Sequence, residues 1–211
     1  MTHPNSISRP AAAETPEQAA AQKPGSAPDK AALRRQLLQA RLAVDPATRQ
    51  AWDQQIAARL QQWCRQHKPR SMGVYWPIQA EPDLLALYPA LAAAGIQLAL
   101  PIVQARNAPL TFAQWTPGDA MEKDGYGIPI PAVRDSTIWP DVLLIPCVGF
   151  SLGKFRLGYG GGYYDRTLAA APHTAAMTAI GIGYQCGLAE FATEPHDAAL
   201  DVVLTESACL A

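Results

Sequence analysis

The sequence predicts an α/β fold: a single domain whose mainly parallel central sheet is flanked by helices in three layers. Short apolar runs alternate with helical patterns in a βαβ rhythm. Two continuous apolar runs, residues 142–145 and 179–182, are typical of strands buried on both faces. A chain of 211 residues, 49% of them apolar, is also long enough to bury one substantial core.

Two helices are predicted before the first strand. The first follows Asp29, a favourable N-cap, and the second follows the pair Asp45–Pro46, in which an N-cap precedes a first-turn proline. Lys68 and Pro69 end the second helix. Helical spacing of apolar residues predicts one buried face in each: Leu33, Leu37, Leu38 and Leu42 in the first, and Trp52, Ile56, Leu60 and Trp63 in the second.

The alternating part of the chain follows. We expect strands at residues 72–76, 96–100 and 110–115 before the two buried strands, and a helix at residues 84–94 that ends at Gly95. A passage rich in glycine and proline, residues 117–131, predicts a long surface excursion near a ligand. Ligands of parallel sheets collect outside the carboxyl ends of the strands, which indicates the loops after Trp76, Val148 and Gly183.

Composition excludes several function classes. A net charge of -1 gives no broad positive field for nucleic acid, and no apolar run is long enough to span a bilayer. Cys64, Cys147, Cys186 and Cys209 form no CxxC pair, so we interpret them as buried, reduced thiols of a cytoplasmic protein. Residues 1–28, rich in alanine and proline, are interpreted as a disordered leader.

The most informative segment is a glycine-rich loop between a predicted strand and a predicted helix. Four of the five residues 158–162 are glycine, and Arg156 and Arg166 flank them. Backbone N–H groups without neighbouring side chains approach phosphate oxygens closely, so the loop predicts polyphosphate binding. The spacing matches neither a Walker loop nor the dinucleotide GxGxxG pattern. The alternative is a tight turn without a ligand.

Residues 143–168, LLIPCVGFSLGKFRLGYGGGYYDRTL, resemble the signature of the 5-formyltetrahydrofolate cyclo-ligase family, whose core is RLGYGGGYYDR or a close variant. The resemblance extends to Lys30 and Arg34, to the triplet 81–83, and to His196-Asp197 with Asp201. It therefore implies a catalytic domain at residues 29–211. Ser151 and Lys154 depart from the family pattern, which often has Asp and Gly there, but the loop keeps its length.

The resemblance implies an ATP- and Mg²⁺-dependent enzyme that acts on 5-formyltetrahydrofolate, with or without a polyglutamate tail, as a monomer. Arg156 and Tyr163 are the implied catalytic residues, and Asp165 and Asp197 the implied metal ligands. The implied nucleotide site comprises Lys30, Arg34, Arg156, Leu157, Gly158, Tyr159, Gly160, Gly161, Gly162, Tyr163, Tyr164 and Asp165. The implied substrate site comprises Trp76, Ile78, Glu81, Asp83, Tyr159, Gly160, Gly161, Gly162 and Tyr163.

Each implied role has a structural alternative. Lys30 and Arg34 could simply lie on a solvated helix face. Asp165 is favourable in the first turn of a helix, and Asp197 could cap a turn. The paired tyrosines suit a core, and residues 81–83 suit a helix start. His196 and Cys147 have no visible partner set and receive no role.

Three other functions stay open. They are a non-catalytic nucleotide or folate sensor, an RNA-associated protein, and a related ATP-dependent enzyme with a different formyl or heterocyclic substrate. The retained Lys30, Asp165 and Asp197 argue against the sensor, and the lack of a basic patch or a second domain argues against RNA. Only substrate tests separate the third.

Overall fold

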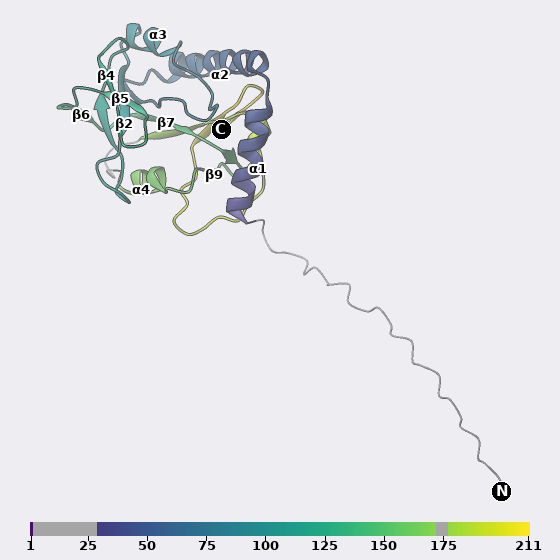
Figure 1. Cartoon of the computed structure of the whole chain (residues 1–211). Coiled ribbons are helices and arrows are strands. Elements are labelled where there is room, and N and C mark those ends of the chain that lie inside the picture. The colour runs from purple at the N-terminus through teal and green to yellow at the C-terminus, as the bar shows by residue number, and fades with distance from the viewer. Residues whose placement is uncertain (2–28, 172–176) are drawn as a thin grey trace.

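A computed structural model of the chain describes residues 1, 29–171 and 177–211. The predicted leader therefore lies outside the described residues, except for Met1. The remaining chain forms one domain built on a mixed sheet, with four α-helices among the described residues (Figure 1). None of the helices that the structure describes is long and apolar enough to cross a membrane.

The central sheet has eight strands among the described residues, in the order β12-β11-β10-β7-β1-β2-β3-β6. The five strands from β11 to β2 run parallel, and the outer strands β12, β3 and β6 pair antiparallel. The prediction of a mainly parallel sheet in a single domain is confirmed. The strands are β1 (Ser71–Gly73), β2 (Gln97–Ile102), β3 (Thr111–Gln114), β6 (Thr137–Ile138), β7 (Val142–Pro146), β10 (Thr178–Ile182), β11 (Val202–Leu204) and β12 (Cys209–Leu210).

Alternating residues of the central strand β7 separate two cores. Leu144 faces a cluster that includes Ile56 and Leu60 of α2 (Pro46–His67) and Tyr88 of α3 (Tyr88–Ala93). Ile145 faces a second cluster, against which α4 (Tyr163–Ala169) packs. Figure 1 shows α2 and α3 on one side of the sheet and α4 on the other. Because α4 is the sole helix on its side among the described residues and has seven residues, a full third layer stays a prediction.

The first helix, α1 (Lys30–Ala43), covers the site instead of a face of the sheet. Leu33 and Leu37 pack against Val148 and Leu157, at the carboxyl end of β7. Leu157 belongs to the small hairpin β8 (Gly149–Phe150) and β9 (Arg156–Leu157), which α1 therefore holds in place. Figure 1 shows α1 running past β9 at one end of the sheet.

The helix starts follow the predicted caps. The Asp29 carboxylate accepts a hydrogen bond from Ala31 N, and the Asp45 carboxylate accepts two, from the backbone of residues 47 and 48. Lys68 ends α2 in a left-handed conformation with φ 49°. The predicted helix at residues 84–94 begins later, at Tyr88, because residues 84–87 form a tight turn closed by Leu87 N and Leu84 O.

Two predictions about burial are wrong. Leu42 is 56% exposed, and the neighbouring Arg41 is 3% exposed and occupies the buried face of α1. The cysteines divide into two classes: Cys64 and Cys147 are buried, but Cys186 and Cys209 are exposed. All four are free thiols.

Candidate active site

The glycine loop lies between β9 and α4, beyond the carboxyl end of the central strand, where the sequence predicts it. Gly160 and Gly162 have φ values of 92° and 64°, which residues with a Cβ rarely adopt. A Cβ on Gly162 would also lie 2.8 Å from Nη1 of Arg166. Arg166 in turn donates a hydrogen bond to Gly161 O at 2.7 Å, so this arginine braces the loop from within.

Two cations of α1 reach this loop and its surroundings; that they bind nucleotide phosphates stays a prediction. Arg34 donates through Nε to Gly158 O at 2.8 Å. Lys30 forms ion pairs with Asp197 at 2.9 Å and Glu194 at 3.0 Å. Burial acts to lower the pKa of Lys30, but the hydrogen bonds to Asp197 and Glu194 outweigh it and leave the pKa raised. The predicted nucleotide-binding lysine and metal-binding aspartate are therefore direct partners in this structure.

Arg156, in β9 just before the glycine loop, is a buried cation. Its side chain is 4% exposed and donates to the Asp165 carboxylate through Nη2 and to Ala198 O through Nη1. The Asp197 residue adjoins Ala198, so the guanidinium brings both predicted metal ligands to one region. Burial acts to raise the pKa of Asp197, but the Glu194 N–H and Lys30 lower it below its ordinary value.

Hard carboxylate oxygens of Asp165 and Asp197 suit Mg²⁺, but they do not form a metal cage. No group of three or more His, Cys, Asp or Glu side chains among the described residues is placed to hold a metal ion. A magnesium ion that is bound by nucleotide phosphates needs only one or two protein carboxylates, because it keeps phosphate and water ligands. The donor set therefore fits magnesium that arrives with a nucleotide.

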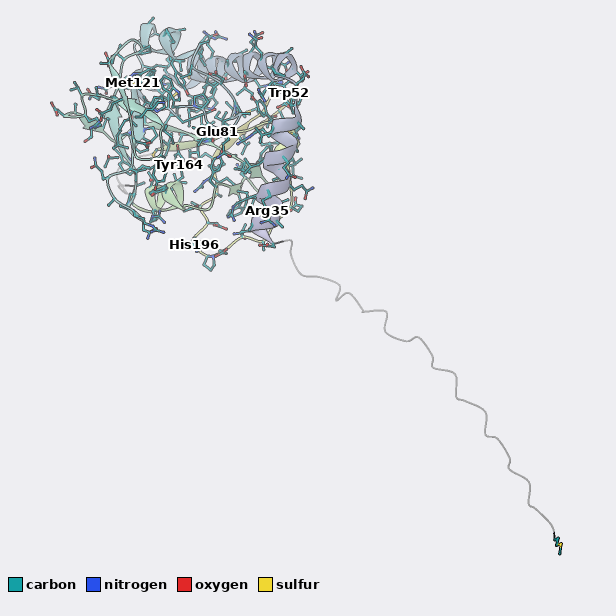
Figure 2. The ribbon with its side chains drawn as sticks, viewed as in Figure 1. Arg35, Trp52, Glu81, Met121, Tyr164 and His196 are labelled. Carbon is teal, nitrogen blue, oxygen red and sulfur yellow. The ribbon has the colours of Figure 1, made fainter. Side chains whose placement is uncertain are left out.

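Glu81, a predicted substrate residue, is a buried carboxylate in the turn after β1. It is 3% exposed, accepts a hydrogen bond from Tyr159 Oη at 2.8 Å, and accepts another from Ile78 N at 2.9 Å. Burial raises the pKa of Glu81, against the opposing effect of these hydrogen bonds and of the nearby Arg41 charge. Figure 2 shows Glu81 in the interior of the domain. A buried carboxylate with raised pKa is typical of a functional site.

The structure brings two of the other predicted substrate residues, Ile78 and Asp83, to one hollow with Glu81 but leaves Trp76 out of it. A hollow of about 340 Å³ between the start of α2 and the turn after β1 is lined by Ile78, Glu81 and Asp83. Asp83 is exposed and accepts a hydrogen bond from Leu85 N in a turn. Residues 81–83 do not start a helix, because α3 begins at Tyr88. Trp76 packs edge-on against Trp115, 6.3 Å between ring centroids, and does not line this hollow.

The predicted surface excursion contacts the start of α4, directly after the glycine loop, through a pair of tyrosines. Strands β4 (Met121–Lys123) and β5 (Pro129–Pro131) form a hairpin, and Tyr126 at its turn lies 3.0 Å, hydroxyl to hydroxyl, from Tyr163. Tyr126 is 65% exposed. Tyr164, which follows Tyr163 in α4, packs in the second core beneath the loop. Burial raises the pKa of its phenol.

The departures at residues 151 and 154 preserve the turn that leads into the loop. Lys154 has φ 62°, a left-handed conformation that glycine adopts more easily. The Lys154 N–H donates to Ser151 O, and the Ser151 N–H donates to Phe155 O, so the turn closes.

Cys147 and His196, to which the sequence assigns no role, lie in different surroundings. Burial raises the pKa of the Cys147 thiol to about 12, which makes it unreactive. His196 lies at the surface (Figure 2).

Sequence reasoning missed Arg41, Tyr126 and the α2 residues Arg49 and Asp53 that line the hollow. The sequence does contain a pattern that could have identified Arg41. Lys30, Arg34 and Arg41 are spaced by four and seven residues, which places all three cations along one side of a helix. We overlooked this row of cations because the spacing of the leucines already predicted the buried face of the helix.

Comparisons with known proteins identify the family of the chain. A family model of the 5-formyltetrahydrofolate cyclo-ligase family matches residues 26–206. A 5-formyltetrahydrofolate cyclo-ligase of Mycolicibacterium smegmatis is 34% identical over 83% of this chain and 93% of its own length. The enzyme of the same name from Escherichia coli K12 is 30% identical over 80% of this chain and 96% of its own length.

Two solved structures share the fold. The 5,10-methenyltetrahydrofolate synthetase of Mycoplasma pneumoniae has a TM-score of 0.71 and 27% identity, covering 84% of this chain and 99% of that one. The synthetase of Aquifex aeolicus has a TM-score of 0.74 and 25% identity, covering 85% and 91%. Fold, glycine loop and relatives together define an α/β ligase. Within that class, the chain belongs to the 5-formyltetrahydrofolate cyclo-ligase family.

Proposed function

We propose that this protein catalyses the ATP-dependent cyclisation of 5-formyltetrahydrofolate to 5,10-methenyltetrahydrofolate, with release of ADP and phosphate. The observation that carries the proposal is the hydrogen bond from Tyr159 to Glu81. It joins the glycine loop, whose backbone suits phosphates, to a buried carboxylate, which suits the N–H donors of a reduced pterin. A phosphoryl donor and its acceptor would therefore meet at Tyr159.

The chemistry proceeds in two steps. The formyl oxygen attacks the γ-phosphorus of ATP, and ADP leaves. N10 of the folate then attacks the activated formyl carbon, and the C–O bond breaks so that the original formyl oxygen leaves with phosphate. N10 loses its proton during ring closure. The enzyme contributes mainly position and electrostatic stabilisation, as in other phosphoryl transfers.

The phosphate half of the site supplies the cations. Arg156 is held by Asp165 and Ala198, so its charge is fixed where the γ-phosphoryl group would move. Lys30 and Arg34 lie one turn apart on α1 and would exchange their present partners for phosphate oxygens. Bound Mg²⁺, held in part by Asp165 and Asp197, would neutralise phosphate charge. With two helical turns, α4 contributes less than the loop itself.

The substrate half orients the folate. Glu81 would accept pterin N–H groups, and Tyr163 would give an aromatic wall next to the formyl group. Tyr163 is placed for this by two contacts: Thr167 bonds its backbone carbonyl, and the Arg166 guanidinium lies 5.1 Å from its ring centroid. We also retain, as part of the proposal, action as a cytoplasmic monomer on folates with or without a polyglutamate tail.

The test is the near-ultraviolet absorbance of purified protein mixed with 5-formyltetrahydrofolate, with and without MgATP. Growth of the methenyl band that depends on ATP, with one ADP formed for each product molecule, is the expected result. A flat trace from protein that still binds ATP would overturn the proposal and favour a sensor or an enzyme for another formyl compound. A screen of formyl compounds would then separate these two.

A further inference from the structure

We propose that Arg41 is a positioning residue that ties the glycine loop to Glu81 through the Tyr159 hydroxyl. The inference rests on the proposed function, because it assigns Glu81 to folate binding and the loop to nucleotide binding. Arg41 would touch neither ligand. It would act by holding two groups that do.

The hydrogen bonds form one continuous chain. Arg41 Nη2 lies 2.6 Å from Tyr159 Oη, and Tyr159 Oη lies 2.8 Å from Glu81 Oε1. The second carboxylate oxygen of Glu81 accepts from Ile78 N at 2.9 Å. An arginine only donates, and an ionised carboxylate only accepts. The single hydroxyl proton of Tyr159 must therefore point to Glu81, so every direction in the chain is fixed.

Residues from three separate elements meet in this chain of hydrogen bonds. Arg41 comes from α1, Tyr159 from the glycine loop, and Glu81 from the turn after β1. Tyr159 is 39% exposed, yet its hydroxyl lies between two side chains that are each 3% exposed. Tyr159 is therefore partly accessible to solvent, while its hydroxyl anchors the loop to the interior.

Arg41 is a poor choice for stability alone. Its Nε is buried and has no hydrogen-bond partner among the described residues, and its Nη1 is 3.4 Å from Cys147 O. Leaving a buried charge incompletely hydrogen-bonded is costly, and an apolar side chain like the neighbouring Leu37 would fill the same face more cheaply. The arginine is better explained by what it positions.

The chain has two consequences for the reaction. The Arg41 charge favours the ionised form of Glu81, which accepts hydrogen bonds from the substrate. Movement of the glycine loop when nucleotide binds would also shift Tyr159, and with it Glu81. Binding of nucleotide and of folate should therefore be coupled, and the coupling should depend on Arg41.

Kinetics of Arg41→Met, Arg41→Lys, Tyr159→Phe and the Arg41→Met/Tyr159→Phe double variant test this inference. Loss of one charge-assisted hydrogen bond should raise KM for 5-formyltetrahydrofolate roughly tenfold in Arg41→Met, with a much smaller change in kcat. Arg41→Lys should recover part of that loss because it keeps the charge. The double variant should be little worse than either single variant, because both break the same chain.

Arg35→Met is the matched control, since Arg35 is an exposed arginine of the same helix (Figure 2). Equal KM values for Arg41→Met and Arg35→Met would overturn the inference, and so would additive effects in the double variant. If Arg41→Met does not fold, Arg41→Lys and Tyr159→Phe carry the same comparison. If wild-type protein forms no methenyl product, the proposed function fails instead, and dissociation constants for 5-formyltetrahydrofolate in the same variants still decide the role of Arg41.

Discussion

The two halves of the proposed site, one for phosphate and one for the folate substrate, hold their charges in different ways. In the phosphate half, cations contact carboxylates directly: Arg156 pairs with Asp165, and Lys30 with Asp197. In the substrate half, a neutral hydroxyl separates Arg41 from Glu81. The first half is self-neutralised and must exchange partners when an anion binds. The second keeps its carboxylate in place before any ligand arrives.

This difference indicates which interactions stabilise the charges of each half before and after a ligand binds. A cation that leaves a direct ion pair for an incoming phosphate exchanges one charge-assisted hydrogen bond for another, and the displaced carboxylate becomes free to bind a metal ion. A buried carboxylate is costly to ionise, and its cost is met by fixed hydrogen bonds from Tyr159 and Ile78. Substitutions in the two halves should therefore affect different kinetic constants.

The largest effect is expected in the phosphate half, for Arg156→Ala. This change removes a buried cation and leaves Asp165 without its partner, so turnover with MgATP should fall about 100-fold or more. Breaking a buried pair should also cost roughly 3 kcal/mol of unfolding free energy. Turnover and thermal melting measure the two losses. Arg156→Lys is the control for charge, and wild-type turnover in Arg156→Ala would remove this residue from the site.

A second change in the same half concerns the metal. Asp165→Asn keeps the size of the side chain but weakens a hard oxygen ligand, so the Mg²⁺ concentration that gives half-maximal rate should rise roughly tenfold. A titration of rate against Mg²⁺ at fixed ATP measures it. Asp135→Asn, an exposed aspartate in the chain between β5 and β6, is the control. Identical Mg²⁺ curves for both variants would contradict the ligand assignment.

In the substrate half, Glu81→Gln should separate stability from binding. Burial raises the pKa of Glu81 in the folded protein, so the folded state binds this proton more tightly than the unfolded state. Ionised Glu81 therefore lowers stability at neutral pH. This loss is complete above the folded-state pKa and disappears below the unfolded value of about 4.5.

Glu81→Gln should consequently keep or raise the melting temperature at neutral pH while KM for 5-formyltetrahydrofolate rises about tenfold. The gain in melting temperature should vanish in acid. Asp83→Asn provides the comparison, because Asp83 is exposed and already caps Leu85 N. A larger rise in KM for Asp83→Asn than for Glu81→Gln would show that the wrong carboxylate has been assigned.

The smallest expected effect is in the backbone that presents Glu81. Gln79 and Ala80 have φ values of 46° and 57°, and Glu81 N bonds Ile78 O, as in a type I′ turn. Glycine adopts this conformation without strain, so Ala80→Gly should stabilise the protein by up to about 1 kcal/mol. Denaturant unfolding measures the gain. Ala86→Gly, where φ is not positive, should instead destabilise, and equal effects at both positions would refute the strain argument.

Much of the fold follows from local patterns. Asp29 and Asp45 cap the helices that the sequence predicts, and the buried runs at residues 142–145 and 179–182 are adjacent parallel strands. The predicted boundaries were less accurate. The strand predicted at residues 72–76 ends at Gly73, and the helix predicted at residues 84–94 starts at Tyr88. In both places a turn or an irregular segment replaces the predicted element. The antiparallel outer strands β6 and β12, of two residues each, are too short to give a periodic signal.

The sequence by itself determined where the glycine loop lies, between a strand and a helix, and that its backbone needs glycine. Gly160 and Gly162 have positive φ values, and with the flanking arginines they predict a phosphate site. The tertiary structure alone decided the partners: Lys30 with Asp197, Arg156 with Asp165, and Arg41 with Tyr159 and Glu81. Two of these pairs, Lys30 with Asp197 and Arg41 with Tyr159, are separated by more than a hundred residues. Hydrophobic packing of α1 against β9 brings these two pairs together, and that packing depends on the whole sheet rather than on any local pattern.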